Sequence, residues 1–454
     1  MKKKLRKRMS TLLAVILAVC MLGGCASVVP TDGGKDKGET STSKTEESEK
    51  TGETSPSGDA STPAGETKEP TVLLSVTYPV EPAETLPSED ILKAVRQFGV
   101  LTASELLGGS ENMLYSPMSL YFALALAAEG ANGETLAQMQ ALLGAEGMDD
   151  YAEQCGILFR SLCRESDDGI MRIANSLWMQ YGYEFHQEYL DSVKNNLFAS
   201  IYEVDFSSAE TGKEIGRWIA DNTGGMLSYD FTPDPSRILS IINTVWLKGS
   251  WVDTFNKEET DDGTFTKADG STLNVPFMHR YDHSVTVYKG DGFIRAEMSI
   301  YRLGRMVFIL PDEGKTPEDI GTDAAAWDEI LHGGTAVRAN VNWYVPKYEG
   351  KNTLDLGRYL ETKIPAAFSG ADFSRMTDGD AYIGGVTQKT RIRWDEEGVE
   401  AAAYTEIAVN STGLITEKPE EIEFRLDRPF IYGIQTYDGL DLFVGTVYDP
   451  AATE

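Results

Sequence analysis

Residues 394 to 413 read Trp-Asp-Glu-Glu-Gly-Val-Glu-Ala-Ala-Ala-Tyr-Thr-Glu-Ile-Ala-Val-Asn-Ser-Thr-Gly, within a chain of 454 residues. After Gly398, small or apolar side chains alternate with mostly polar ones, which is typical of a half-buried strand. Alanine is a poor strand former, however, and the stretch runs into a turn-like Asn-Ser-Thr-Gly. The pattern therefore predicts a loop that inserts into a β-sheet. An ordinary edge strand and a short Ala-rich helix are the alternatives on this stretch alone.

The alternation divides the stretch into two sets of side chains, one for each face of a strand. The inward face would carry Val399, Ala401, Ala403, Thr405, Ile407, Val409 and Ser411. The outward face would carry Glu400, Ala402, Tyr404, Glu406, Ala408 and Asn410. A slip of one residue would turn both glutamates inward, and an unpaired buried carboxylate is costly. The sequence therefore specifies one register for insertion.

This region resembles the hinge and reactive loop of the serpin superfamily, whose pattern is Glu-Glu-Gly-Thr-Glu-Ala-Ala-Ala-x-Thr. Val399 stands where the pattern has Thr, and the bulky Tyr404 belongs to the outward set. The resemblance assigns the hinge to Glu396, Glu397, Gly398, Val399, Glu400, Ala401, Ala402, Ala403 and Thr405. Two later runs are similar to the family's closing signature, namely Asp427-Arg428-Pro429-Phe430 and Phe443-Val444-Gly445-Thr446-Val447-Tyr448-Asp449-Pro450.

Further motifs follow in the family's order between residues 88 and 454. They are Asn112-Met113-Leu114-Tyr115-Ser116-Pro117-Met118-Ser119, Ala174-Asn175-Ser176-Leu177-Trp178, Val204-Asp205-Phe206, Asn243-Thr244-Val245-Trp246-Leu247-Lys248-Gly249-Ser250-Trp251, Val275-Pro276-Phe277-Met278, Leu310-Pro311-Asp312 and Val345-Pro346-Lys347-Tyr348. One such motif is a weak signal, whereas an ordered set over most of the chain is a strong one. The resemblance implies an α+β fold of three β-sheets with about nine helices and an exposed reactive loop.

Apolar spacing gives a coarse secondary structure without the resemblance. Helical spacing occurs at residues 89–108, 117–129, 134–143 and 149–163. Strands dominate from residue 239 onward, for example at 284–288, 306–310 and 337–345. No linker rich in Pro, Gly or Ser divides residues 87–454, so we expect one large domain there.

The N-terminus has the features of a secretion signal, with six basic residues ahead of an apolar run. The run ends in Leu22-Gly23-Gly24-Cys25, which resembles a bacterial lipobox; a plain signal peptide or a short membrane anchor is the alternative. We expect residues 1–24 to be a lipoprotein signal peptide and Cys25 to carry the lipid. Residues 25–86 are of low complexity and predict a disordered tether, with one apolar island at 72–76 that either packs on the domain or does nothing. The expected location is the extracellular side of the bacterial cell membrane.

Composition limits the classes of partner. The formal net charge is −30 at pH 7, and such an acidic chain disfavours nucleic acid, whose phosphates need clustered Lys and Arg. Beyond the signal and the lipid site, the only cysteines are Cys155 and Cys163. Their spacing within a predicted helix is too wide for a disulfide, so we expect two buried thiols. We also expect a monomer.

The sequence shows no catalytic centre, and we expect that the chain is not an enzyme. His279 and His283 have the spacing of a metal site, but no Glu follows His279 as the HExxH motif requires. Gly314-Lys315-Thr316 resembles the end of a phosphate loop, yet Ile309 stands where the first glycine should be. No Gly-x-Ser-x-Gly elbow occurs. We therefore expect no metal and no cofactor.

The resemblance implies protease inhibition by a suicide-substrate mechanism. A serine protease attacks the loop and forms an acyl-enzyme, and the loop then inserts into the largest sheet before deacylation. The inward hinge residues are all uncharged and none is a bulky aromatic, as an inserting strand requires. The resemblance also implies a buried polar cluster at the sheet opening, made by Ser116, Ser119, Asn243 and Gln388. Gln388 stands where the family often has His; it keeps the hydrogen bonds but does not titrate.

Family spacing from Gly398 places the scissile bond between Thr412 and Gly413. The stretch from the hinge to Pro429 is longer than in many serpins, so the bond from Leu414 to Ile415 is the alternative. The residues before the bond are small and uncharged, which favours elastase-like or subtilisin-like proteases as covalent partners. The alternative from another class is a non-inhibitory protein that uses the serpin fold as a surface binding or scaffold module.

Overall fold

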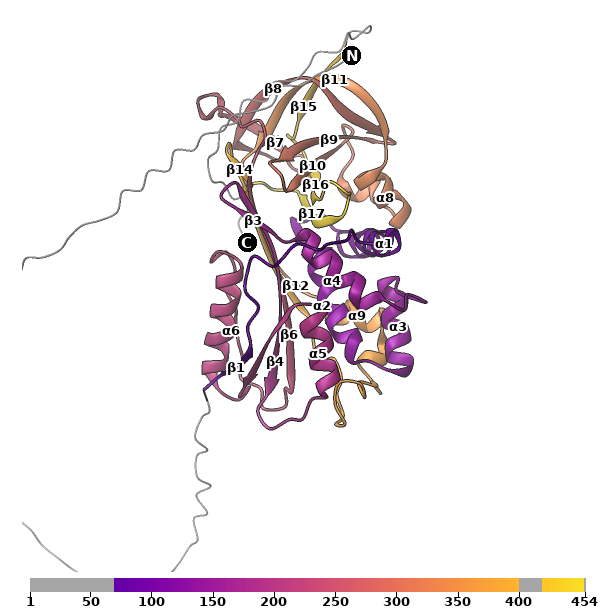
Figure 1. Cartoon of the computed structure of the whole chain (residues 1–454). Coiled ribbons are helices and arrows are strands. Elements are labelled where there is room, and N and C mark those ends of the chain that lie inside the picture. The colour runs from indigo at the N-terminus through magenta and orange to yellow at the C-terminus, as the bar shows by residue number, and fades with distance from the viewer. Residues whose placement is uncertain (1–68, 400–418, 453–454) are drawn as a thin grey trace, which may run out of the picture. The chain divides into compact units, whose positions relative to one another are not determined.

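The computed structural model describes residues 69–399 and 419–452, whose helices and strands are shown in Figure 1. The four helices expected from apolar spacing are confirmed as α1 to α4, each to within two residues at either end. The described residues contain nine α-helices: α1 (Glu89–Leu106), α2 (Pro117–Gly130), α3 (Gly133–Leu143), α4 (Tyr151–Leu162), α5 (Gln187–Asn195), α6 (Ala209–Asn222), α7 (Pro317–Ile320), α8 (Ala324–His332) and α9 (Gly357–Lys363). Most of them precede residue 239, as the sequence predicts.

The first β-sheet has eight strands in the described residues, in the order β1-β5-β4-β6-β14-β13-β12, with β3 paired to β4. Their bounds are β1 (Thr71–Leu74), β3 (Arg164–Ser166), β4 (Gly169–Gln180), β5 (Ala199–Val204), β6 (Leu239–Ser250), β12 (Tyr348–Asp355), β13 (Thr387–Trp394) and β14 (Gly398–Val399). α6 lies on one side of this sheet and α2 and α5 lie on the other (Figure 1). The described part of β14, which lies between β6 and β13, comprises Gly398 and Val399.

The second β-sheet has nine strands in the described residues, in the order β15-β11-β8-β9-β10-β16-β17-β2, with β7 paired to β8. Their bounds are β2 (Met113–Tyr115), β7 (Asp261–Thr266), β8 (Thr272–Gly290), β9 (Phe293–Ile300), β10 (Gly304–Pro311), β11 (Thr335–Pro346), β15 (Glu420–Arg425), β16 (Phe430–Gln435) and β17 (Asp441–Val447). The strands expected at 284–288, 306–310 and 337–345 are confirmed within β8, β10 and β11. The second and third sheets of the expected fold form one hydrogen-bonded network, because the long β8 pairs with β7, β9 and β11.

The structure also describes the end of the segment that the sequence assigns to the tether. β1 pairs with β5 through Thr71, Val72 and Leu74. The amide of Val76 donates to the Ser200 hydroxyl at 3.0 Å, and Val80 packs in the main hydrophobic core. The apolar island at 72–76 therefore packs on the first sheet, and the fold takes in residues ahead of position 87.

The described residues form two hydrophobic clusters, and the larger one holds both predicted thiols. Cys155 and Cys163 are buried and unpaired, as expected, and burial raises the pKa of each thiol to about 12. Strands β16 and β17 are buried at every position, which explains their continuous apolar runs. Within the described ranges, no helix is long and apolar enough to cross a membrane.

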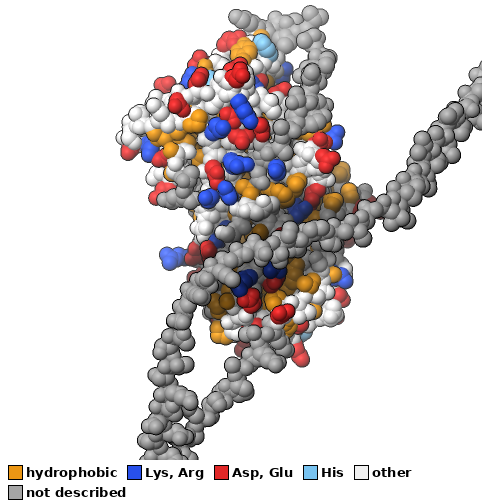
Figure 2. All heavy atoms as spheres, turned by 90° about the vertical axis from the view of Figure 1, so that its left-hand side faces the viewer, with side chains coloured by type: hydrophobic (Ala, Val, Ile, Leu, Met, Phe, Trp, Pro, Cys, Tyr) orange, Lys and Arg blue, Asp and Glu red, His pale blue; other side chains and the backbone are white. Residues whose placement is uncertain are grey.

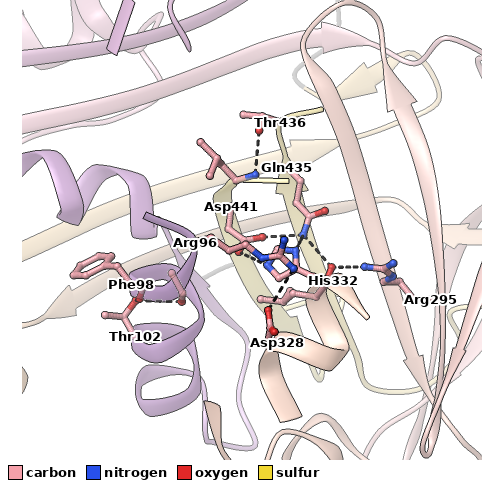
Figure 3. Close-up of polar contacts among 12 residues, drawn as sticks. Arg96, Phe98, Thr102, Arg295, Asp328, His332, Gln435, Thr436 and Asp441 are labelled. Atoms are coloured by element: carbon pink, nitrogen blue, oxygen red, sulfur yellow. Dashed lines mark hydrogen bonds and ion pairs between the residues drawn. The ribbon is translucent and has the colours of Figure 1, made fainter. Parts of the chain in front are cut away.

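A buried polar cluster joins α8 to the second sheet (Figure 3). The Nε2 atom of His332, the last residue of α8, lies 3.1 Å from Oδ2 of Asp441 on β17. The side-chain amide of Gln435 on β16 donates to Oδ1 of Asp441 at 2.9 Å and to the carbonyl of Leu331 at 3.1 Å. Arg295 of β9 donates to the same carbonyl. These bonds fix the end of α8 on β16 and β17.

Candidate hinge and sheet opening

The described part of the hinge enters the first sheet at Gly398 and Val399. Gly398 pairs with Ser250 of β6, and Val399 pairs with Gly249 of β6 on one side and with Trp394 of β13 on the other. Val399 is buried, with 2 % of its surface exposed. Residue 399 therefore has the inward orientation that the alternation predicts.

Gly398 is required here because of a close backbone approach. A Cβ atom at this position would lie 2.2 Å from the carbonyl oxygen of Gly249 and 2.7 Å from the Cα of Ser250. Both atoms belong to the backbone of β6, which does not yield as a flexible side chain would. The hinge glycine thus allows the chain to pass between β6 and β13.

Hydrogen bonds of Glu396 hold the beginning of the hinge in place. Lys347, between β11 and β12, donates from Nζ to both carboxylate oxygens of Glu396 at 2.8 and 3.1 Å. The hydroxyl of Thr260 donates to the same carboxylate at 2.9 Å. The backbone carbonyl of Glu396 accepts from the amide of Phe255 at 2.9 Å. Glu396 is buried, and its side chain ties the hinge to Lys347 and Thr260 while its backbone ties it to Phe255.

These contacts also set the ionisation of Glu396. Burial opposes the charged form, but hydrogen bonds from Lys347, the backbone amide of Glu396 and Thr260 outweigh it. The pKa of the Glu396 carboxyl is therefore held below its usual value. Glu397 is more exposed and pairs with Lys257, while its carbonyl accepts from the amide of Trp251 at 3.0 Å.

The predicted sheet-opening cluster divides into two hydrogen-bonded groups. In the first, Gln388 of β13 accepts from the backbone amide of Ser116 at 2.8 Å and donates to its carbonyl at 2.9 Å. The Ser116 hydroxyl donates to the carbonyl of Leu442 at 2.7 Å and accepts from the amide of Ser119 at 3.2 Å. Ser116 is also the N-cap of α2, with Pro117 in the first turn. This group therefore joins the beginning of α2 to β13 and β17.

Asn243 belongs to the second group. Its side-chain amide donates to Oδ1 of Asn175 on β4 at 2.7 Å, and Asn175 donates to the carbonyl of Leu197 at 2.6 Å. Oδ1 of Asn243 and the hydroxyl of Thr244 are buried polar atoms without a hydrogen-bond partner among the described residues. Such atoms are uncommon in a folded protein, and here both lie on β6 beside the opening.

The opening itself lies between β6 and β13. In the described part of the chain these two strands share no ladder pair, because β14 separates them and ends at Val399. A cavity between them is lined by Ser116, Ser119, Asn243, Lys389, Arg393 and Val399, among other residues. Among the described residues, Gly398 and Val399 are therefore the ones that join β6 to β13.

Several predicted site residues lie outside the described residues. They are Cys25, the hinge residues Glu400, Ala401, Ala402, Ala403 and Thr405, and the candidate scissile residues Thr412, Gly413, Leu414 and Ile415.

The structure adds residues that the sequence-based prediction of the site omits. Lys347 and Thr260 bind Glu396, and Asn175 binds Asn243. The signals were present for two of them, since Lys347 and Asn175 each lie within a motif that resembles the family. Thr260 carries no such signal, because only the fold brings β7 and the hinge together.

Comparisons with known proteins agree with this geometry. The family model described as Serpin (serine protease inhibitor) matches residues 93–450. An uncharacterized serpin-like protein of Thermococcus kodakarensis is 32 % identical over 408 residues, covering 85 % of this chain and 94 % of the relative. Mouse neuroserpin is 28 % identical over 395 residues, covering 81 % of this chain and 92 % of the relative.

Solved structures show the same fold. Tengpin, a thermophilic serpin in its native state, has a TM-score of 0.71 at 25 % identity, covering 84 % of this chain and all of that one. Thyroxine-binding globulin in complex with thyroxine has a TM-score of 0.67 at 24 % identity, covering 80 % of this chain and 99 % of that one. The match of the family model over most of the chain, and the two-residue strand at the opening of the first sheet, lead to one conclusion: this chain belongs to the serpin family.

Proposed function

We propose that this protein is an inhibitory serpin that traps extracellular serine proteases as a suicide substrate. The observation that carries the proposal is the opening between β6 and β13, where the described part of the hinge pairs with both strands through Gly398 and Val399. A strand that continued from Val399 would pair with both neighbours and close the sheet. Serpins are described as serine protease inhibitors, and the inward residues of this loop suit such insertion.

Continuing the register of β14 supports the proposal. Each further residue of the hinge moves one position back along β6 and one back along β13. Ala401 would then face Leu247 and Ile392, which are both buried. Thr405 would face Asn243 and Gln388, and a hydroxyl there would give the unpartnered Oδ1 of Asn243 a donor.

The chemistry of trapping follows from the loop. The protease serine attacks the carbonyl carbon of the scissile bond, and the carbonyl residue becomes an ester of the serine oxygen. The proton of the serine passes to the new amine, which leaves as the N-terminus of the C-terminal fragment. We propose Thr412–Gly413 as this bond, with Leu414–Ile415 as the alternative. Insertion then acts before water hydrolyses the ester.

An incubation with elastase tests the inhibitory function. We expect an adduct that survives denaturing gel electrophoresis, with the mass of the protease plus the chain up to its cleaved bond. Mass spectrometry of the released C-terminal peptide identifies the bond, and subtilisin and trypsin serve as comparisons. We expect adducts with elastase or subtilisin and little with trypsin. Complete turnover without an adduct by all three proteases would contradict the proposal.

A second candidate function is that of a non-inhibitory binding protein. The fold resembles that of thyroxine-binding globulin, whose structure is in complex with thyroxine. A groove of about 680 Å³ lies between α1, α8 and the turn before β17, lined by Leu92, Arg96, Val100, Asp328 and Leu440, among other residues. That volume suits a small molecule. The adduct experiment separates the two functions, since a binding protein would be cleaved without forming an ester-linked product.

We also propose that Cys25 carries a lipid that holds a monomeric protein on the outer side of the bacterial cell membrane. The apolar run ahead of Cys25 and the low-complexity segment after it support this location. Cys25→Ala is expected to remove the protein from the membrane fraction while the domain keeps its inhibitory activity. Equal retention of the variant and the parent in that fraction would refute the anchor.

A further inference from the structure

Two cationic side chains flank the register position that directly follows Val399 of β14. Val399 pairs with Gly249 and Trp394, so the next residue of the same strand would pair with Lys248 on β6 and Arg393 on β13. Both side chains lie on the solvent side of the sheet, since their neighbours Leu247 and Trp394 are buried. A strand between β6 and β13 would have each of them about 4.8 Å away in backbone spacing.

Lys248 and Arg393 differ from the other cations near the opening. Lys389 pairs with Asp230 at 2.6 Å, and Arg391 pairs with Glu349 at 2.6 Å. Neither Lys248 nor Arg393 forms an ion pair with any residue that the structure describes. Figure 2 shows Lys and Arg side chains interspersed with Asp and Glu on the face that it presents. In a chain of net charge −30, two cations that flank one register position and have no carboxylate partner among the described residues indicate a position kept for an acidic group.

We propose that Lys248 and Arg393 form a seat for the carboxylate of Glu400, and that this seat stabilises the register begun by Gly398 and Val399 as the loop inserts. The inference rests on the proposed inhibitory function. Glu400 directly follows Val399 in the sequence and belongs to the outward set. In the inserted strand its carboxylate meets a cation on each side, and opposite charges on neighbouring strands stabilise their pairing.

The seat also discriminates against a slipped strand. A shift of one residue would place the carboxylate of Glu400 on the inward face, beside the buried Leu247 and Ile392. It would leave Val399 between Lys248 and Arg393. Correct register therefore gains two ion pairs, whereas the slipped register loses both and buries a charge. The two cations are positioning residues, and they act on the competition between insertion and deacylation.

Charge reversal tests the seat in the full-length protein. The double variant Lys248→Glu/Arg393→Glu is expected to lower the ratio of adduct to cleaved product with elastase by about two- to fivefold, the range for a cross-strand charge pair. Adding Glu400→Lys to that variant is expected to restore the ratio. Lys351→Glu is the matched control, since Lys351 is an exposed cation of the same sheet on β12 and does not border the opening. It is expected to leave the ratio unchanged.

A second readout separates failure of the seat from failure of the function. Each protein is cleaved between Val409 and Leu414, and its melting temperature is compared with that of its intact form. The reversal should reduce the rise on cleavage, and Glu400→Lys should recover it. An unchanged adduct ratio in the reversed variant, or no rescue by Glu400→Lys, would overturn the seat while the function stands. A charge-dependent rise without any adduct would support the seat and overturn the inhibitory function. No rise in the parent would overturn both.

Discussion

At the scale of single residues, the Glu396–Lys347 pair holds the hinge in place. The carboxylate is buried and accepts from two side chains of separate segments, while the backbone of the same residue binds Phe255. A buried carboxylate that loses its cation keeps the cost of desolvation without the compensation. The position of the hinge therefore depends on one ammonium group.

Replacing Lys347 with Ala is expected to lower the free energy of unfolding by about 1 to 3 kcal/mol, because a buried acceptor loses its charged donor. Urea unfolding of the variant and the parent at pH 7 measures this difference. The folded-state pKa of Glu396 lies below its unfolded value, so the pair stabilises above the unfolded pKa of about 4.3. That contribution is lost as the pH falls through the lower, folded pKa, and the two unfolding curves should converge there.

Lys257→Ala is the control for this prediction, since it removes an exposed partner from the neighbouring Glu397. We expect it to have a smaller effect, because solvent screens an exposed pair. Equal destabilisation by both variants would show that burial of Glu396 plays no part.

The inward positions of the hinge permit a second test on single side chains. Ala401→Arg or Ala403→Arg would bring a charge onto the inward face, where burial without a partner costs several kcal/mol. We expect folded variants that elastase cleaves as a substrate, with most of the adduct lost. The ratio of adduct to cleaved product on a gel measures the change. Ala408→Arg, which adds the same charge on the outward face, should retain the adduct. Adducts of the Ala401 and Ala403 variants at the parent's level would show that the register is wrong.

At the scale of elements, Gln388 connects the first sheet to the beginning of α2. Its side-chain amide bonds both the amide and the carbonyl of Ser116, and the Ser116 hydroxyl in turn donates to the carbonyl of Leu442 on β17. One side chain of β13 therefore fixes a helix that lies across the opening. Any separation of β6 from β13 must leave this contact intact or break it.

Gln388→Ala is expected to lower the free energy of unfolding by about 1 to 3 kcal/mol, because it leaves a buried amide of Ser116 without its acceptor. Thermal or urea unfolding measures the loss. Thr387→Ala, at the exposed neighbouring position of β13, should change stability little. A loss no greater than that of the control would contradict the structural importance of this contact.

The elements also show what a sequence reveals. The helices α1, α3 and α4 were predictable because each buries one face and repeats its apolar residues at helical spacing, whereas α2 is apolar and buried at most of its positions. The strands β4 and β5 were not predicted from periodicity, because β4 is buried on both faces over most of its length and lacks alternation. β1 was assigned to the tether, since its pairing with β5 depends on a partner more than 120 residues away.

The candidate site, like the fold, was predictable from the sequence only in part. Its motifs identified Ser116, Asn243 and Gln388, because their types and order resemble the family. Pairing between them was not predictable, since Asn243 bonds Asn175 while Gln388 bonds Ser116. The partners of Glu396 come from segments near residues 260 and 347, and only the folded chain brings these together.

At the scale of the whole molecule, cleavage of the loop is expected to raise stability. Each ladder hydrogen bond that a new strand adds contributes about 1 kcal/mol, and full burial of Ile407 or Val409 adds about 1.5 to 3 kcal/mol each. Together these exceed the loss from cutting one loop. Limited cleavage between Val409 and Leu414, followed by a melting curve, should give a higher midpoint than that of the intact protein.

A cut elsewhere on the surface is the control for this prediction, since an ordinary nick leaves the midpoint unchanged or lowers it. A midpoint that stays the same or falls after cleavage of the loop would leave the binding function as the remaining proposal. The comparison needs no protease target, because it measures the serpin alone.

Starting a new strand in a sheet is entropically harder than extending one, because two distant segments must first be brought together. In this molecule that first step is complete in the intact protein, since Val399 already pairs with Gly249 and Trp394. From such a nucleus the strand lengthens one residue at a time, starting at Val399. The time between acylation of the protease and its trapping would then depend on the rate at which the strand lengthens. Substitutions near residue 399 would act earlier in insertion than substitutions farther along the loop.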